Sequence, residues 1–240
     1  SSTIPNIVQD FESIEVIRKY SRKLQQLFED LTVSILTDPE ISVKVALLKN
    51  ILPLCKYFGR EKTNDVILSH LITYLNDRDP ALRMYLVECI SGIAILLGPI
   101  TMEQYILPLI IQTITDEEEL VVVSVLKNLK DLLKTRFVNK KYFYDITKFL
   151  SPLILHPNSW IRNFVLTTLV ECINQMSKAE VYCVLYPVLR PFFDFDVDFT
   201  GDMLISCAKL PVSRNTYNLL RSWNNRSKKT FFWQRVTTNY

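Results

Sequence analysis

Apolar residues recur along the chain three or four positions apart, which is the spacing of one face of an α-helix. The clearest stretch is residues 82–98, with Leu82, Tyr85, Leu86, Cys89, Ile90, Ile93, Leu96 and Leu97. Residues 161–176 repeat this pattern, and further helix-like apolar segments cover 22–37, 65–76, 103–115, 141–155 and 180–193. The pattern predicts an all-α chain with almost no strand, and the β-branched run 120–125 is placed by its register at the start of a helix.

Polar turns separate these helices at a regular period of about 40 residues. Asp38, Asp77 and Asp116 are evenly spaced at this period, and His156 stands at the equivalent place one repeat later. Three of the turns contain a proline: Pro39, Pro80 and Pro157. In the same three turns a basic residue follows the Asp or His at a constant offset: Lys44, Arg83 and Arg162. One helical pair cannot bury both faces, so the period predicts a HEAT-type α-solenoid of about four to five helical hairpins.

The turn residues suggest two contacts. The fixed offset between Asp77 and Arg83 suggests that carboxylates and guanidinium groups form a ladder between neighbouring turns, interrupted where Val122 replaces the basic residue. Trp160, in the fourth turn, is expected to pack against the solenoid. The alternative is an exposed anchor for a partner, because tryptophan is enriched at interface hot spots.

Glycine and proline positions indicate where helices in the repeat end or bend. Gly59 and Gly98 stand one repeat apart and are expected to close two helices, because glycine accepts the left-handed conformation. Pro108, Pro152 and Pro187 stand inside three of the helices that precede the turns. Proline removes a backbone donor and bends a helix, so these helices are predicted to be bent, as they commonly are in HEAT repeats.

The net charge of +3 is unevenly distributed. Residues 203–240 carry seven basic and no acidic residues, which leaves a charge of −4 on residues 1–202. We expect the solenoid to cover 1–202, and short helices with a basic, aromatic-rich linker toward a further domain to cover 203–240. Candidate partner or anion contacts in this tail are Arg221, Trp223, Arg226, Lys228, Lys229, Trp233 and Arg235. Such a mixture can bind nucleic acid or anionic lipid; the alternative, which we favour, is that it docks on an acidic patch of the solenoid or the next domain.

No catalytic, cofactor or metal site is expected. The four glycines contain no G-x-G pair, so a phosphate-cradling loop is excluded. Neither a G-x-S-x-G elbow nor H-E-x-x-H nor the protein-kinase signatures occur. The five cysteines contain no C-x-x-C pair and are predicted to be buried, reduced thiols. The longest uncharged stretch, 89–102, is shorter than the roughly 20 residues of a membrane span, and no leader peptide is expected.

Five strings resemble one known family in order and spacing: Asn64–His70, Ile72–Asp77, His156–Arg162, Ala179–Cys183 and Pro211–Arg214. They resemble the HEAT-repeat region of the protein-kinase-like regulatory scaffold subunit of the class III phosphatidylinositol 3-kinase complex, a vacuolar protein sorting subunit. The resemblance covers about residues 60–222. It implies that this segment is not an enzyme, although the parent carries a separate serine/threonine kinase-like domain and a WD-repeat propeller.

The resemblance also implies partners and a location. The partners would be the lipid kinase catalytic subunit and Beclin-type coiled-coil subunits, with peripheral association to membranes through the complex and no nucleic acid. The location would be cytoplasmic, on endosome, vacuole or autophagosome membranes. Two alternatives stay open: a generic HEAT-repeat adaptor, and a protein that binds nucleic acid or anionic membranes through its basic tail.

Overall fold

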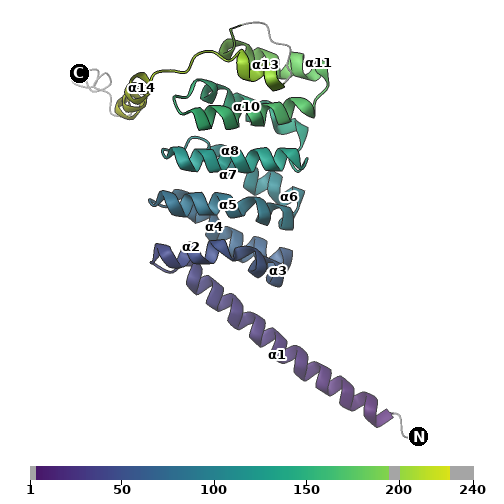
Figure 1. The fold of residues 1–240 in the computed structure, drawn as a ribbon. Helices are drawn as coiled ribbons and strands as arrows, with labels where there is room; N and C mark the ends of the chain where they lie inside the picture. The colour runs from purple at the N-terminus through teal and green to yellow at the C-terminus, as the bar shows by residue number, and fades with distance from the viewer. Residues whose placement is uncertain (1–3, 195–200, 228–240) are drawn as a thin grey trace, which may run out of the picture. The chain divides into compact units, whose positions relative to one another are not determined.

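The structure is a computed structural model that describes residues 4–194 and 201–227. The chain divides into two compact units, residues 1–109 and 110–240, which are described separately. Both are built from helices (Figure 1). The described residues contain no strand, only an isolated bridge between Phe193 and Ala208. The all-α prediction is confirmed, and the β-branched run 120–125 is helical as its register indicates.

The first unit contains the start of the helical stack. Its elements are α1 (Ile4–Leu36), α2 (Ile41–Lys49), α3 (Ile51–Lys62), η1 (Thr63–Leu68), α4 (Ser69–Thr73), η2 (Tyr74–Asn76), α5 (Pro80–Leu97), α6 (Pro99–Thr101) and η3 (Met102–Ile106). Helices α2 and α3 both pack against α5. Leu82 and Leu86 of α5 are buried, as the periodic apolar pattern predicts, and so are Leu48 of α2 and Ile51 of α3. Helix α7 (Leu107–Thr113) follows, across the division between the units.

The second unit continues with α8 (Glu119–Lys134), η4 (Lys140–Tyr142), α9 (Phe143–Leu150), η5 (Ser151–Leu155), α10 (Ser159–Asn174), α11 (Lys178–Glu180), η6 (Val181–Leu185), α12 (Tyr186–Leu189), η7 (Arg190–Phe192), α13 (Gly201–Ser206) and α14 (Arg214–Ser227). Helix α10 packs against α8 and against α13, so the three are stacked in layers (Figure 1). Val125, Leu129, Val165 and Leu169 are fully buried in this stack.

The helices that precede the turns are irregular at repeated positions. Wide π-type turns begin at Thr63, Met102 and Val181, which share one register of the repeat and are all buried. Pro108 and Pro187 lie at the second position of the α-helical segments that directly follow two of these turns. Pro152 lies in the 3₁₀ segment η5. Because proline cannot donate the regular helical hydrogen bond, the backbone changes its helix type there.

Two glycines adopt backbone conformations that other residues avoid. Gly59 has φ 78° and interrupts α3, and Gly98 has φ 94° and ends α5. The guanidinium of Arg60 donates from Nε to the carbonyl oxygen of Leu97 at 3.1 Å, and a Cβ added to Gly98 would collide with Arg60 Nη2. The prediction that these glycines close helices is therefore confirmed, and the second also gives room to the arginine that caps α5.

One described helix, α5, is long and apolar enough to cross a membrane by length and composition alone, with a mean hydropathy of 1.6. The sequence did not predict such a segment, because Arg83 and Glu88 interrupt the uncharged run. Packing of α5 against α2 and α3 accounts for its apolar composition.

The thiols differ from their predicted burial in one clear case. All five cysteines are free, and Cys55 and Cys172 are buried, but Cys183 is exposed. It lies on η6 between Val181 and Leu185, which are both buried, and its neighbour Tyr182 is exposed as well. The apolar surroundings of Cys183 in the sequence therefore did not indicate the side of the helix on which it lies.

Candidate interaction site

The four repeat turns share one hydrogen bond. The side chains of Asp38, Asp77 and Asp116 each accept from the backbone N–H two residues later, at 2.8, 3.0 and 2.8 Å. His156 does the same with its ring, because Asn158 N–H donates to Nδ1 at 3.0 Å. A neutral imidazole thus replaces a carboxylate in the fourth turn, and Nε2 carries the ring proton. The substitution preserves the turn and removes its charge.

Two arginines close these turns through main-chain carbonyl groups. Arg83 Nη1 donates to the carbonyl oxygens of Asp77 and Arg78 at 2.7 and 3.3 Å. Arg162 Nη1 donates to those of His156 and Pro157 at 2.7 and 2.8 Å. These bonds lie within a single turn, and the carboxylate ladder between neighbouring turns stays a prediction. The Asp77 carboxylate itself accepts from the N–H of Asp79.

The other predicted turn residues have local roles. Lys44 Nζ lies 5.2 Å from the ring centroid of Tyr74, as a cation–π contact. Pro80 is the first residue of α5, where its missing N–H costs nothing. Pro39 and Pro157 lie in the turns before α2 and α10.

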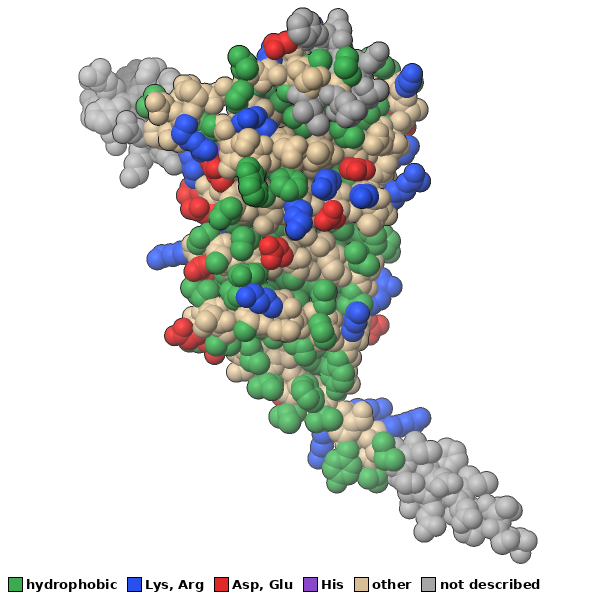
Figure 2. Space-filling view, viewed as in Figure 1, with side chains coloured by type: hydrophobic (Ala, Val, Ile, Leu, Met, Phe, Trp, Pro, Cys, Tyr) green, Lys and Arg blue, Asp and Glu red, His purple; other side chains and the backbone are tan. Residues whose placement is uncertain are grey.

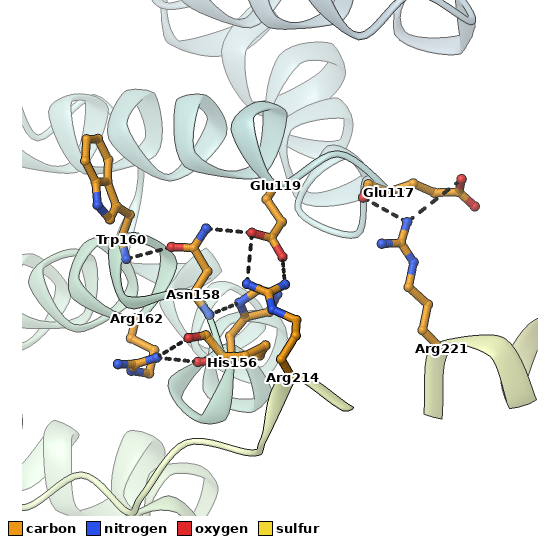
Figure 3. A network of polar contacts seen from close by, with 9 residues as sticks. Glu117, Glu119, His156, Asn158, Trp160, Arg162, Arg214 and Arg221 are labelled. Atoms are coloured by element: carbon orange, nitrogen blue, oxygen red, sulfur yellow. Dashed lines mark hydrogen bonds and ion pairs between the residues drawn. The ribbon is translucent and has the colours of Figure 1, made fainter. Parts of the chain in front are cut away.

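The turns of the third and fourth repeats are joined by Glu119, at the start of α8. Asn158 caps α10 by accepting from Trp160 N–H at 2.9 Å, and its Nδ2 donates to Glu119 Oε2 at 2.6 Å (Figure 3). The same carboxylate is paired with the guanidinium of Arg214 from α14. One glutamate thus connects α8, α10 and α14.

Helix α14 and the residues just before it make further contacts in this region. Arg221 Nη2 donates to the carbonyl oxygen of Glu117 at 2.8 Å and lies 3.9 Å from its carboxylate (Figure 3). The rings of Tyr217 and His156 meet edge to face at a centroid distance of 4.6 Å. Just before α14, Val212 N–H donates to Leu155 O at 2.9 Å. The described part of the basic segment therefore lies on acidic residues of the third turn.

This arrangement shifts two pKa values. The hydrogen bond from Arg214 is the main cause that lowers the pKa of Glu119, and the bond from Asn158 acts in the same direction. Burial is the main cause that lowers the pKa of His156; the charge of Glu119 opposes this, and the charges of three nearby arginines add to it. The site therefore favours an ionised Glu119 beside a neutral His156.

The chain matches the family described as PIK3R4-like, middle domain, over residues 6–221. The chain belongs to this family. It is 64% identical over 229 residues to the serine/threonine-protein kinase VPS15 of Saccharomyces cerevisiae, a match that covers 95% of this chain and 16% of that protein. It is 46% identical over 215 residues to the putative serine/threonine-protein kinase VPS15 of Komagataella pastoris, covering 89% of this chain and 16% of that protein.

Membership of the PIK3R4-like middle-domain family confirms the resemblance found in the sequence. The matched region is the middle domain, so this segment is not the kinase domain of those relatives. Among solved structures, the crystal structure of Cex1p has a TM-score of 0.62 at 16% identity and covers 75% of this chain and 34% of that one. This likeness concerns the fold alone, and it agrees with a stack of helical repeats.

In this middle-domain chain, the expectation that Trp160 packs is wrong. Its side chain is 68% exposed, and Leu120, at the equivalent position of the third repeat, is 69% exposed. Both stand at the second position of a helix, Trp160 of α10 and Leu120 of α8. Both lie close in sequence to the Glu119 network, because Leu120 directly follows Glu119 and Trp160 lies two residues after Asn158, whose side chain binds Glu119.

Beside the network lies a cleft of about 420 Å³. Its lining includes Glu117, Lys148, Phe149, Tyr217 and Arg221, so charges of both signs surround an aromatic wall. The described residues contain no group of three or more His, Cys, Asp or Glu side chains arranged to hold a metal ion.

The remaining residues predicted in the tail are only partly placed. Trp223 and Arg226 belong to α14, but their side chains lie outside the described residues, as do Lys228, Lys229, Trp233 and Arg235 altogether. Sequence reasoning missed Glu119, Asn158 and Arg214 as contact residues. The only local signal was the acidic run 116–119, which is typical of a helix start.

Proposed function

We propose that this chain is a non-catalytic scaffold segment that organises the class III phosphatidylinositol 3-kinase complex through protein–protein contacts. Its partners would be the lipid kinase catalytic subunit and the Beclin-type coiled-coil subunits. The chain spans 16% of the length of these two curated relatives. We infer that this part of the protein contributes a docking surface for other subunits. Family membership supports this role, together with the geometry around Glu119.

The observation that carries the proposal is the exposure of Trp160 and Leu120 on a braced framework. A scaffold surface needs apolar anchors that are held rigidly, because ordering them on binding costs entropy. The bond between Asn158 and Glu119 ties the starts of α10 and α8 together, directly beside the two anchors. Tryptophan at such a position contributes large contact area with few rotatable bonds.

The location belongs to the same proposal. A scaffold of a lipid kinase complex would be cytoplasmic and peripheral on endosome, vacuole or autophagosome membranes, where it is held by its partners. The described cations of the C-terminal segment support attachment through partners rather than direct anion binding, because Arg214 and Arg221 are paired with glutamates. Binding of nucleic acid through this segment is disfavoured for the same reason.

The test is capture of identified subunits by the tagged chain from a lysate that contains the complex. The unmodified chain should retain the lipid kinase catalytic subunit and a Beclin-type subunit, measured by quantitative mass spectrometry. A double variant, Trp160→Ala with Leu120→Ala, should reduce the capture at least fivefold without lowering the melting temperature. The control is Ile95→Ala, another exposed apolar residue on the outer side of α5, which should capture normally.

Two results would overturn the proposal. Capture of other complexes without the lipid kinase would favour the generic HEAT-repeat adaptor. Equal capture by the double variant and the unmodified chain would show that the exposed pair is not an anchor.

A further inference from the structure

Helix α1 carries an exposed apolar stripe in the first unit. Between residues 16 and 31, seven large apolar side chains are 41–68% exposed: Val16, Ile17, Tyr20, Leu24, Leu27, Phe28 and Leu31. At 100° per residue they fall within an arc of about 120°. Figure 2 shows hydrophobic side chains gathered on this helix, with Lys and Arg side chains beside them. A continuous apolar patch of this kind marks an interaction surface.

The stripe is distinct from the side of α1 that packs on the rest of the unit. Glu29 is paired with Lys62 of α3, and Thr32 and Leu36 are buried. These three positions follow one another at helical spacing on a different face from the stripe. Phe28, at the edge of the stripe, meets the ring of Tyr57 at 5.7 Å. Helix α1 is therefore anchored along one side and presents its apolar stripe on another.

The spacing of the stripe selects the kind of partner. Ile17, Tyr20, Leu24, Leu27 and Leu31 alternate between three-residue and four-residue steps. That alternation is the seam of a coiled coil, in which each apolar side chain inserts between four side chains of a facing helix. A helix that lies on a membrane needs no such register. The seam therefore favours a helical partner.

The charges beside the seam select the partner's composition. Arg18, Lys19, Arg22 and Lys23 are exposed, and no acidic residue occurs between Val16 and Phe28. Within the described part of the chain, the side chains of these four residues have no hydrogen bond or ion pair. Lys19 and Lys23 lie one turn apart along one edge of the stripe. Carboxylates at the flanking positions of a facing helix would complement them, whereas a second copy of α1 would bring like charges together.

We propose that the stripe on α1 docks an amphipathic α-helix from outside the described chain, with a three–four apolar seam and Asp or Glu residues beside it. The surface belongs to the first unit and is separate from Trp160, so the inference goes beyond the proposed function. Any polypeptide with such a helix fits, whether or not it belongs to a lipid kinase complex.

The experiment measures binding of designed peptides to the chain by fluorescence anisotropy. One peptide of about four heptads has Leu in the seam and Glu at the flanking positions, so that it cannot pair with itself. The second has the same seam with Lys at the flanks. The acidic peptide should bind at least tenfold more tightly than the basic one, and added salt should weaken it.

Variants of exposed residues make the test specific. The double variant Leu24→Glu with Leu27→Glu should weaken binding of the acidic peptide at least tenfold. Ile95→Glu on α5 should leave that binding unchanged. Lys19→Glu with Lys23→Glu should reverse the preference toward the basic peptide while the melting temperature stays unchanged. Reversal by charge exchange is a result that general stickiness of the stripe would not give.

Three outcomes would overturn the inference. Equal binding of the two peptides would remove the charge selection. Binding to mixed phosphatidylcholine and phosphatidylserine vesicles through Leu24 and Leu27, with no binding of the acidic peptide, would make the stripe a membrane contact. Dimerisation in sedimentation through the same residues would make a second copy the occupant.

Discussion

The guanidinium of Arg214 is bonded to the carboxylate of Glu119, 95 residues earlier in the chain. Through that bond the C-terminal helix α14 is fastened to the start of α8, where Asn158 of α10 reaches the same carboxylate. The framework beside the exposed Leu120 and Trp160 therefore depends on residues from three helices.

Loss of the Arg214 bond should release α14 without unfolding the stack. The pair is solvent-accessible, so its removal should change the melting temperature little. We expect Arg214→Ala to accelerate hydrogen–deuterium exchange across α14, with unchanged exchange in the buried parts of α8 and α10. Lys127→Ala, an exposed residue of α8, is the control and should leave α14 unaffected. Unchanged exchange in Arg214→Ala would contradict a fastening role for the pair.

The neutral state of His156 should make the stability of the chain depend on pH. Burial lowers the pKa of His156 below the ordinary value of 6.5, so the unfolded chain binds a proton before the folded chain does. This contribution is therefore complete above pH 6.5 and is lost as the pH falls toward the folded pKa. The free energy of unfolding in urea, measured in slightly alkaline and in mildly acidic buffer, gives the size of this contribution.

His156→Asn is the matched control for this pH dependence. Asparagine can accept the Asn158 N–H as the aspartates of the other turns do, but it does not titrate. The unfolding free energy of the variant should fall less on acidification than that of the unmodified chain. Parallel pH profiles for the two proteins would refute the assignment to His156.

Tyr74 should contribute to the stability of the first unit through its hydroxyl group. The phenol is buried and donates to the carbonyl oxygen of Leu36, and burial, with the nearby Asp77, raises its pKa to about 12. Tyr74→Phe leaves that carbonyl without its donor and should cost about 1–2 kcal/mol in urea unfolding. Tyr57→Phe changes an exposed tyrosine and should be neutral. Equal effects of both substitutions would argue against the buried bond.

The thiols should react with maleimide in an order set by burial. Burial raises the pKa of Cys55 to about 11 and those of Cys89 and Cys172 to about 12, so few thiolates form at these positions at neutral pH. Cys183 is exposed and should be labelled first, as read by mass spectrometry of peptides. The buried thiols should react only in denaturant, and early labelling of Cys172 would contradict the packing of α10 against its neighbours.

Much of the fold could be predicted from the sequence because its signals are local. Apolar spacing gives the helices, and the repeat period gives the turns and even the equivalence of His156 with aspartate. Glycine positions predicted two helix ends because a positive φ has a distinct residue preference.

The contacts of the site could not be predicted in the same way. The sequence around Arg214 does not indicate that it pairs with Glu119, because this pairing depends on how α14 packs against the third turn. The exposure of Trp160 was misjudged because the repeat register places a residue along the helix axis without saying which side faces the stack. The helical extent of α1 was also missed, because the predicted helix began at residue 22 although the apolar spacing continues back to Val16.

The central claim is that the starts of α8 and α10 form a docking surface for the lipid kinase complex. Its most direct test is hydrogen–deuterium exchange of this chain, alone and within the purified complex. We predict slower exchange in the complex at the amides around Leu120 and Trp160, and no slowing when both residues are replaced by alanine. Identical exchange of these amides in the free chain and the complex would contradict the claim.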